Sequence, residues 1–240
     1  MKNAYIIIPA LDPEEKLIPY IGELLEADFK DIILVDDGSS PEHKPVFDSI
    51  KEKYDCTIIT HSHNMGKGRA LKNAFEYFLR LPSVGEFEGV ICVDCDGQHT
   101  VNDVCKVYDE LCKGENELIL GSRNFDLGNT PKKSVAGNKS VRLLFKLLCG
   151  LSLNDTQTGL RGIPTSILPE YKNLKGERYE YEMNMLILSA HNKIPVKEIP
   201  IETVYIDENK GSHYRPFADS VRIATLIFKA IFARGPRGRG

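Results

Sequence analysis

The sequence predicts an α/β fold in which helices flank a mostly parallel sheet. Short apolar runs alternate with amphipathic stretches, and the runs begin about 25–33 residues apart, a spacing typical of strand–helix–strand units. The composition, 42% hydrophobic and 27% charged residues, is that of a globular chain with a substantial core. These observations indicate a sheet of parallel strands joined by crossover helices.

Five apolar runs in the first half are the expected strands. They are "AYIII" (4–8), "DIILV" (31–35), "CTIIT" (56–60), "GVICV" (89–93) and "ELILG" (117–121). The runs are short, rich in β-branched residues and apolar on both faces. They are therefore typical of strands buried between two layers of helices.

Amphipathic stretches between the runs are the expected helices. Apolar residues recur with helical spacing over 17–25, 71–79 and 101–112. Thr100 is expected to cap the third helix, with Asp103 in its first turn. The apolar stripe of each helix is expected to pack on the sheet.

The second half of the chain has a less regular pattern. A polar segment, 122–138, predicts a long loop, and helices are expected over 139–150 and 179–190. Two further strands are expected at 195–201 and 202–206. We interpret residues 1–210 as one domain, and residues 211–240 as a C-terminal amphipathic helix with a basic Gly/Arg tail.

Composition also excludes several classes of protein. A net charge of −3 argues against a nucleic-acid partner. The six cysteines lack the spacing of a zinc site, so buried free thiols in a reducing cytoplasm are expected. No apolar run reaches the roughly 18 residues of a membrane span.

Polar residues follow four consecutive expected strands. The strand ends read "LDPEE", "DDGSS", "HSHNMGKGRA" and "DCDGQH". One such end is an ordinary turn, but four in a row favour a binding site, because ligands of parallel sheets bind outside the carboxyl ends of the strands. Neither the dinucleotide fingerprint nor the P-loop motif is present.

Asp94 and Asp96 are the most specific feature of this edge. Two carboxylates placed two residues apart on a strand would repel each other unless a cation lay beside them. Mg²⁺ or Mn²⁺ accepts oxygen ligands of this kind, and Gln98 offers a further oxygen. The remaining ligands would come from substrate phosphates.

Four motifs, "IIIPALDPEE", "ILVDDGSS", "NMGKGRALKNAF" and "CVDCDGQH", resemble in order and spacing the inverting glycosyltransferases of family 2. Four later ones, "LGSRNF", "NDTQTGLRGI", "RYEYEMNML" and "KGSHYRPFADSVRI", resemble the polyprenyl-phosphate hexose synthases of that family. The resemblance spans roughly residues 4–206. It implies a GT-A fold and the metal-dependent transfer of a hexose, with inversion, from a UDP- or GDP-sugar to polyprenyl phosphate.

The resemblance also implies roles for individual residues. The expected catalytic residues are Asp94, Asp96, Arg123 and Asp155. The expected nucleotide-sugar contacts are Pro9, Ala10, Leu11, Glu14, Glu15, Asp37, Lys67, Arg69, Asp94, Cys95 and Gln157. The expected metal ligands are Asp96, Gln98 and Asp94, and the expected acceptor-phosphate contacts are Arg123, Arg161, Lys210 and Arg215. Asp12-Pro13 departs from the family's Asn-Glu, which leaves the register of Glu14 and Glu15 open.

The nature of the acceptor remains a choice between two chemistries. A sugar hydroxyl needs a general base, for which Asp155 or Glu182 is available, whereas a phosphate monoester is largely ionised at neutral pH. The residues favour a lipid phosphate, with a glycan acceptor as the alternative. A non-catalytic nucleotide-sugar-binding module is a third reading, which the intact acidic motif disfavours.

Two amphipathic segments bear on the location of the protein. Residues 141–148 and 221–232 carry apolar stripes flanked by basic residues. Such stripes pack into a core or lie on an anionic membrane surface. We therefore expect a cytoplasmic protein that is peripheral at the inner face of the membrane.

Overall fold

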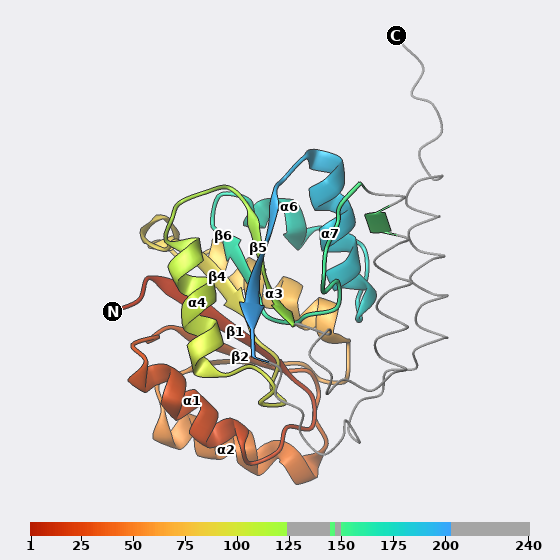
Figure 1. The fold of residues 1–240 in the computed structure, drawn as a ribbon. Helices are drawn as coiled ribbons and strands as arrows, with labels where there is room; N and C mark the ends of the chain where they lie inside the picture. Colours follow the sequence, from red (N-terminus) through yellow and green to blue (C-terminus); the bar gives the residue numbers. More distant parts are fainter. Residues whose placement is uncertain (124–144, 147–149, 203–240) are drawn as a thin grey trace.

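The computed structural model describes residues 1–123, 145–146 and 150–202, which form a seven-stranded sheet between two layers of helices (Figure 1). The strand order is β3-β2-β1-β4-β6-β5-β7. The strands are β1 (Ala4–Ala10), β2 (Ile32–Asp36), β3 (Thr57–Thr60), β4 (Gly89–Cys92), β5 (Leu118–Arg123), β6 (Arg161–Pro164) and β7 (Val196–Ile201).

Most neighbouring strands run in parallel. The pairs β1–β2, β2–β3, β1–β4 and β5–β7 are parallel, whereas β6 lies between β4 and β5 and is antiparallel to both. The register pairs Ala10 with Asp36 and Cys92 with Arg161. The prediction of a mostly parallel α/β fold is confirmed.

Each face of the sheet is covered by its own helices. The α-helices are α1 (Leu17–Glu26), α2 (Lys44–Lys53), α3 (Lys67–Leu79), α4 (Val101–Leu111), α6 (Leu168–Lys172) and α7 (Glu180–Asn192). Successive side chains of β1 enter opposite layers: Ile6 and Ile8 pack with α1, α2 and α4, and Ile7 packs with α3, α6 and α7. This alternation explains why the strand is apolar throughout.

The structure adds elements that the sequence pattern did not reveal and moves the ends of the expected strands by one or two residues. Strand β6 and helices α2 and α6 were not predicted as separate elements. Strand β4 ends at Cys92, one residue earlier than expected, so Asp94 and Asp96 lie in the loop that follows it and not on the strand. The side-by-side geometry of strand neighbours therefore does not apply to these two residues.

Some expectations fall partly or wholly outside the described residues. Of the expected helix at 139–150, the structure describes Phe145, Lys146 and Gly150, and Phe145 is fully buried in the core. Nearly all of the expected loop at 122–138, the strand at 202–206 and the segment 211–240 lie outside the described ranges. In the part that is described, no helix combines the length and apolarity needed to cross a bilayer.

Candidate active site

The sheet topology gathers the predicted site residues at one edge. Strands β1 to β4 are parallel, so their carboxyl ends meet there, and the carboxyl end of β5 joins them. Strand β6 runs the other way, so its first residue, Arg161, lies at the same edge beside Cys92. The sequence-predicted residues at the ends of these strands therefore share one region.

Asp94 is held by a lysine and a histidine side chain. Lys67 Nζ, at the start of α3, lies 2.6 Å from Asp94 Oδ1, and His99 Nε2 lies 3.5 Å from Oδ2. Burial tends to raise the pKa of Asp94, but Lys67 and His99 outweigh it and hold that pKa far below its ordinary value. Asp94 is therefore an ionised carboxylate whose counter-ion is Lys67.

Lys67 bridges two carboxylates from distant parts of the chain. Its Nζ also lies 2.9 Å from Glu182 Oε1, in the first turn of α7. Burial tends to lower the pKa of Lys67, but Asp94 and Glu182 overcome this and raise it above its ordinary value. The sequence predicted Lys67 as a nucleotide-sugar contact, and in the structure its ammonium group lies on Asp94, another of the predicted contacts.

Asp96 has the opposite environment. Its carboxylate is exposed, accepts a hydrogen bond from the Gln98 backbone N–H at 3.0 Å, and has no ion-pair partner among the described residues. Partial burial and the nearby charge of Asp94 raise its pKa. The raised pKa means that a negative charge on Asp96 is unfavourable in the protein alone. A cation beside Asp96 would therefore be stabilised there.

The residues present fit Mg²⁺ or Mn²⁺ and not a structural zinc ion. The described residues contain no group of three or more His, Cys, Asp and Glu side chains placed to hold a metal. Asp94 and Asp96 offer carboxylate oxygens, and the Gln98 amide offers a carbonyl oxygen. This is the donor set of an ion that completes its shell with water and substrate phosphates.

Several buried polar atoms around this edge lack hydrogen-bond partners among the described residues. They include Tyr20 Oη, His99 Nδ1 and Arg161 Nη2. Asp94 and Asp96 act electrostatically on the Tyr20 hydroxyl, whose pKa is raised mainly by burial. Buried polar atoms are normally paired in native proteins, so the unpaired atoms at this edge are compatible with a polar ligand.

Arg123 and Asp155 form a second ion pair at the edge. Arg123 Nε lies 2.6 Å from Asp155 Oδ2, and its Nη2 lies 3.2 Å from Oδ1. Asp155 is fully buried and also accepts a hydrogen bond from the Gln157 backbone N–H at 3.0 Å. The structure thus joins Arg123 and Asp155, two of the predicted catalytic residues, and leaves Asp155 heavily hydrogen-bonded.

Arg161 is built into the wall of the site. Only 1% of it is exposed, and it donates to the carbonyl oxygens of Thr158 at 3.0 Å and Glu182 at 2.7 Å. Its guanidinium group therefore supports the start of α7. Lys210 and Arg215, the other two predicted acceptor contacts on the C-terminal side, lie outside the described residues.

Asp37 holds a neighbouring loop in place. Its carboxylate accepts hydrogen bonds from the Met65 and Gly66 backbone N–H groups at 2.9 and 2.7 Å, and from His61 Nδ1 at 2.7 Å. These bonds occupy the carboxylate of Asp37, which the sequence predicted as a nucleotide-sugar contact. In this structure the carboxylate organises the loop between β3 and α3.

The loop after β1 is tied to the loop after β2. Asp12 has a left-handed backbone, with φ of 49°, and its carboxylate accepts a hydrogen bond from the Ser40 backbone N–H at 2.7 Å.

The predicted nucleotide contacts around this loop differ in exposure. Pro9 and Ala10 are buried at the end of β1, whereas Leu11, Glu14 and Glu15 are exposed and Cys95 is half-buried. Glu14 pairs with Lys16 at 2.9 Å. The geometry favours neither Glu14 nor Glu15 as the nucleotide contact.

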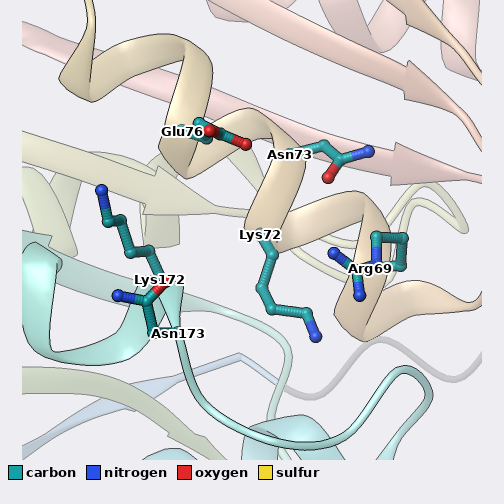
Figure 2. Close-up of a pocket in the computed structure, with 6 residues that line it drawn as sticks. All are labelled: Arg69, Lys72, Asn73, Glu76, Lys172 and Asn173. Carbon is teal, nitrogen blue, oxygen red and sulfur yellow. The ribbon is translucent and has the colours of Figure 1, made fainter.

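Arg69 faces away from Lys67, toward the segment that precedes α7. Its Nε and Nη2 each lie 2.7 Å from a Glu177 carboxylate oxygen, and Lys72 Nζ lies 2.8 Å from the same carboxylate. Figure 2 shows Arg69 and Lys72 in a pocket of about 120 Å³. The other lining residues are Asn73, Glu76, Lys172 and Asn173. Its volume is below the roughly 300 Å³ at which small-molecule sites begin.

Gly159 allows the close approach of the chain to Asp94. A Cβ atom at this position would lie 2.1 Å from Asp94 Oδ2. We predict that Gly159→Ala displaces the carboxylate and lowers the turnover number roughly ten-fold or more, because small errors of position are costly in catalysis. Steady-state kinetics checks this, with thermal unfolding as a test of folding.

The matched control for this prediction is Gly85→Ala. A Cβ atom at Gly85 would meet nothing within 4 Å. Equal activity in the two variants would contradict the role assigned to Gly159.

Comparison with known proteins identifies a family match over much of the chain. Residues 5–170 match the family described as "Glycosyl transferase family 2". This range contains the four motifs of the first half as well as β6 and part of α6.

Two curated relatives align with most of the chain. The UDP-N-acetylglucosamine–dolichyl-phosphate N-acetylglucosaminyltransferase of Methanococcus voltae is 29% identical, over 86% of this chain and 87% of its own length. A dolichyl-phosphate β-glucosyltransferase of Dictyostelium discoideum is 26% identical, over 95% of this chain and 73% of its own length. The two relatives differ in the sugar that their names specify.

Solved structures share the fold. The crystal structure of a mycobacterial protein superposes with a TM-score of 0.66 at 16% identity, over 99% of this chain and 77% of its own length. Similarity at this level of identity concerns the architecture alone.

Proposed function

Because the chain belongs to glycosyl transferase family 2, we propose that it transfers a hexose, with inversion, from a UDP- or GDP-sugar to a polyprenyl phosphate. The chain is a hexosyltransferase enzyme of GT-A fold. The choice of acceptor rests on one observation, the ion-pairing of the carboxylates that could act as a general base. Both side chains that qualify as a general base, Asp155 and Glu182, are ion-paired with cations of the protein.

Paired carboxylates suit an acceptor that needs no base. A phosphate monoester carries most of its charge near neutral pH, since its second pKa is about 6, and it attacks without losing a proton in the step. A sugar hydroxyl would instead require one of these carboxylates to leave its partner and accept a proton. The names of both dolichyl-phosphate relatives support the same acceptor.

The donor side of the reaction is the region of Asp94 and Asp96. In the proposed step the acceptor oxygen forms a bond to the anomeric carbon while the bond from that carbon to the diphosphate breaks. A divalent ion held by Asp96, Asp94 and Gln98 would stabilise negative charge on the departing diphosphate. Lys67 contributes a fixed ammonium charge at the same place, because Asp94 and Glu182 keep it protonated.

The proposed acceptor also implies where the protein works. Polyprenyl phosphate resides in a bilayer, so we propose that the enzyme acts peripherally at the cytoplasmic face of the membrane. Phe145, which belongs to one of the amphipathic segments, is fully buried and packs in the core. That side chain therefore does not contribute to membrane docking in this conformation.

Transfer assays test the proposal directly. Purified protein is incubated with UDP-glucose, UDP-N-acetylglucosamine or GDP-mannose, together with dolichyl or undecaprenyl phosphate and Mg²⁺ or Mn²⁺. We expect one donor to yield a glycolipid of inverted anomeric configuration and EDTA to abolish its formation. Transfer to saccharides but not to lipid phosphate would contradict the acceptor, and product formation in EDTA would contradict the metal.

A further inference from the structure

Exposed apolar side chains gather on the loops of the active-site edge. The structure describes five large exposed hydrophobic residues: Met1, Leu11, Met65, Tyr77 and Tyr179. Leu11 follows β1, Met65 lies between β3 and α3, and Tyr179 immediately precedes α7. An exposed apolar group beside a polar site is typical of a binding surface.

Tyr179 is the most exposed of these three, at 72%, although its chain segment is firmly anchored. Glu177, two residues earlier, receives two hydrogen bonds from Arg69 at 2.7 Å. Glu182, three residues later, pairs with Lys67 at 2.9 Å. An aromatic ring held out to water by an anchored backbone loses little entropy when it binds a ligand.

The backbone of this segment also presses closely against the loop that leads into α3. A Cβ atom at Gly66 would lie 2.3 Å from the Glu177 carbonyl oxygen, and one at Gly68 would lie 2.5 Å from Tyr181 Cβ. Both positions tolerate only glycine without movement of the chain. The position of Tyr179 relative to Lys67 is therefore set by tight backbone packing on both sides.

Tyr179 caps α7 three residues before Glu182, so helical spacing places the two side chains on the same side of this segment, beside Lys67. Burial raises the pKa of the Tyr179 hydroxyl, and the charges of Lys67, Asp94 and Glu182 act on the same group. The ring is thus exposed over most of its surface while its hydroxyl lies within the influence of the charged cluster. This is the amphipathic arrangement that tyrosine offers at binding surfaces.

We infer that Tyr179 contacts the hexose of the nucleotide sugar and helps to determine which sugar the enzyme accepts. The inference rests on the proposed function. A hexose has an apolar C–H face and a rim of hydroxyl groups, which match an aromatic face with a phenolic hydroxyl and neighbouring carboxylates. An isoprenoid chain matches less well, because it would place hydrocarbon beside Lys67, Asp94 and Glu182.

The test compares Tyr179→Ala and Tyr179→Phe with the wild type. Tyr77→Ala serves as a matched control, since Tyr77 is exposed near the far end of α3, about 15 Å along the helix from Lys67. The probes are UDP-glucose, UDP-N-acetylglucosamine and GDP-mannose, each compared with UDP or GDP alone by calorimetry. Donor KM, kcat and the KM for lipid phosphate are measured with the same variants.

We expect Tyr179→Ala to weaken binding of the accepted nucleotide sugar roughly ten-fold, an effect of the size expected when aromatic burial is lost. Binding of the bare nucleotide and the KM for lipid phosphate should stay within two-fold of the wild type. Tyr179→Phe should keep most of the affinity but change the preference among the three sugars. Tyr77→Ala should behave as the wild type.

Three results would overturn the inference. They are equal weakening of sugar nucleotide and bare nucleotide, a rise confined to the KM for lipid phosphate, and no change in any constant. If the wild type binds none of the three donors, the proposed function fails and the inference fails with it. If the wild type binds one and Tyr179→Ala binds it equally well, only the inference fails.

Discussion

Replacing Asp96 by asparagine is expected to reduce glycosyl transfer by about 10²–10³-fold, the usual effect of removing one group that stabilises charge in a transition state. Asp96 is the exposed carboxylate of the acidic pair, and it has no ion-pair partner among the described residues. Asparagine keeps the shape and can still accept from the Gln98 backbone N–H. The loss should therefore appear in kcat and in the affinity for Mn²⁺.

The same variant is expected to fold at least as stably as the wild type. The pKa of Asp96 is raised by burial and by Asp94, so the fold disfavours its charge. Removing that charge should change the free energy of unfolding by no more than about 0.5 kcal/mol, or raise it slightly. Asp109→Asn, on the exposed side of α4, is the control. Unchanged metal dependence in Asp96→Asn would contradict the proposed site.

Replacing Lys67 by methionine is expected to affect both stability and activity. Lys67 is the shared counter-ion of Asp94 and Glu182, and all three side chains are less than one-third exposed. Its removal deprives two carboxylates of their shared lysine, which should lower the free energy of unfolding by roughly 2–4 kcal/mol. Urea unfolding measures this, with Lys51→Met on the exposed surface of α2 as the control.

The pH dependence of stability distinguishes this mechanism from simple loss of packing. The folded-state pKa of Asp94 is depressed, so its contribution is present above the unfolded pKa of about 3.9 and is lost as pH falls through the folded pKa. In Lys67→Met the free energy of unfolding should fall much less as the pH is lowered than it does in the wild type. A double variant with Glu182→Gln should recover part of the stability. Identical acid sensitivity in wild type and Lys67→Met would contradict the assigned ion pair.

The fold was largely predictable because its signals are local. Apolar runs identified five of the described strands, β1 to β5, and β7 was also expected. The capping role of Thr100 is confirmed by its side chain, which accepts from the Asp103 backbone N–H at 3.2 Å. Strand β6 was missed because "RGIP" is a four-residue run that contains a buried arginine. Its strand character comes from pairing with β4 and β5, which no short stretch of sequence reveals.

The residue types of the site were also predictable, but their contacts were not. Lys67 and Arg69 occupy neighbouring positions in one motif, and both were assigned to the nucleotide. Residues two apart on a helix are rotated by about 200° about its axis and lie on nearly opposite faces. Lys67 therefore reaches Asp94, while Arg69 reaches Glu177. The partners Glu177 and Glu182 are more than a hundred positions away in the chain, and only the tertiary structure brings them together.

The position of β6 has a consequence for how the protein folds as it is made. β4 is synthesised about seventy residues before its neighbour β6, and β5 emerges between them without touching β4 in the final sheet. A nascent chain that ends after β5 therefore has a sheet with a gap, and Lys67 has not yet met Glu182. Strands that lie so far apart in the sequence pair more slowly than local contacts form. The nascent chain should therefore acquire donor binding late, only after the start of α7 has left the ribosome.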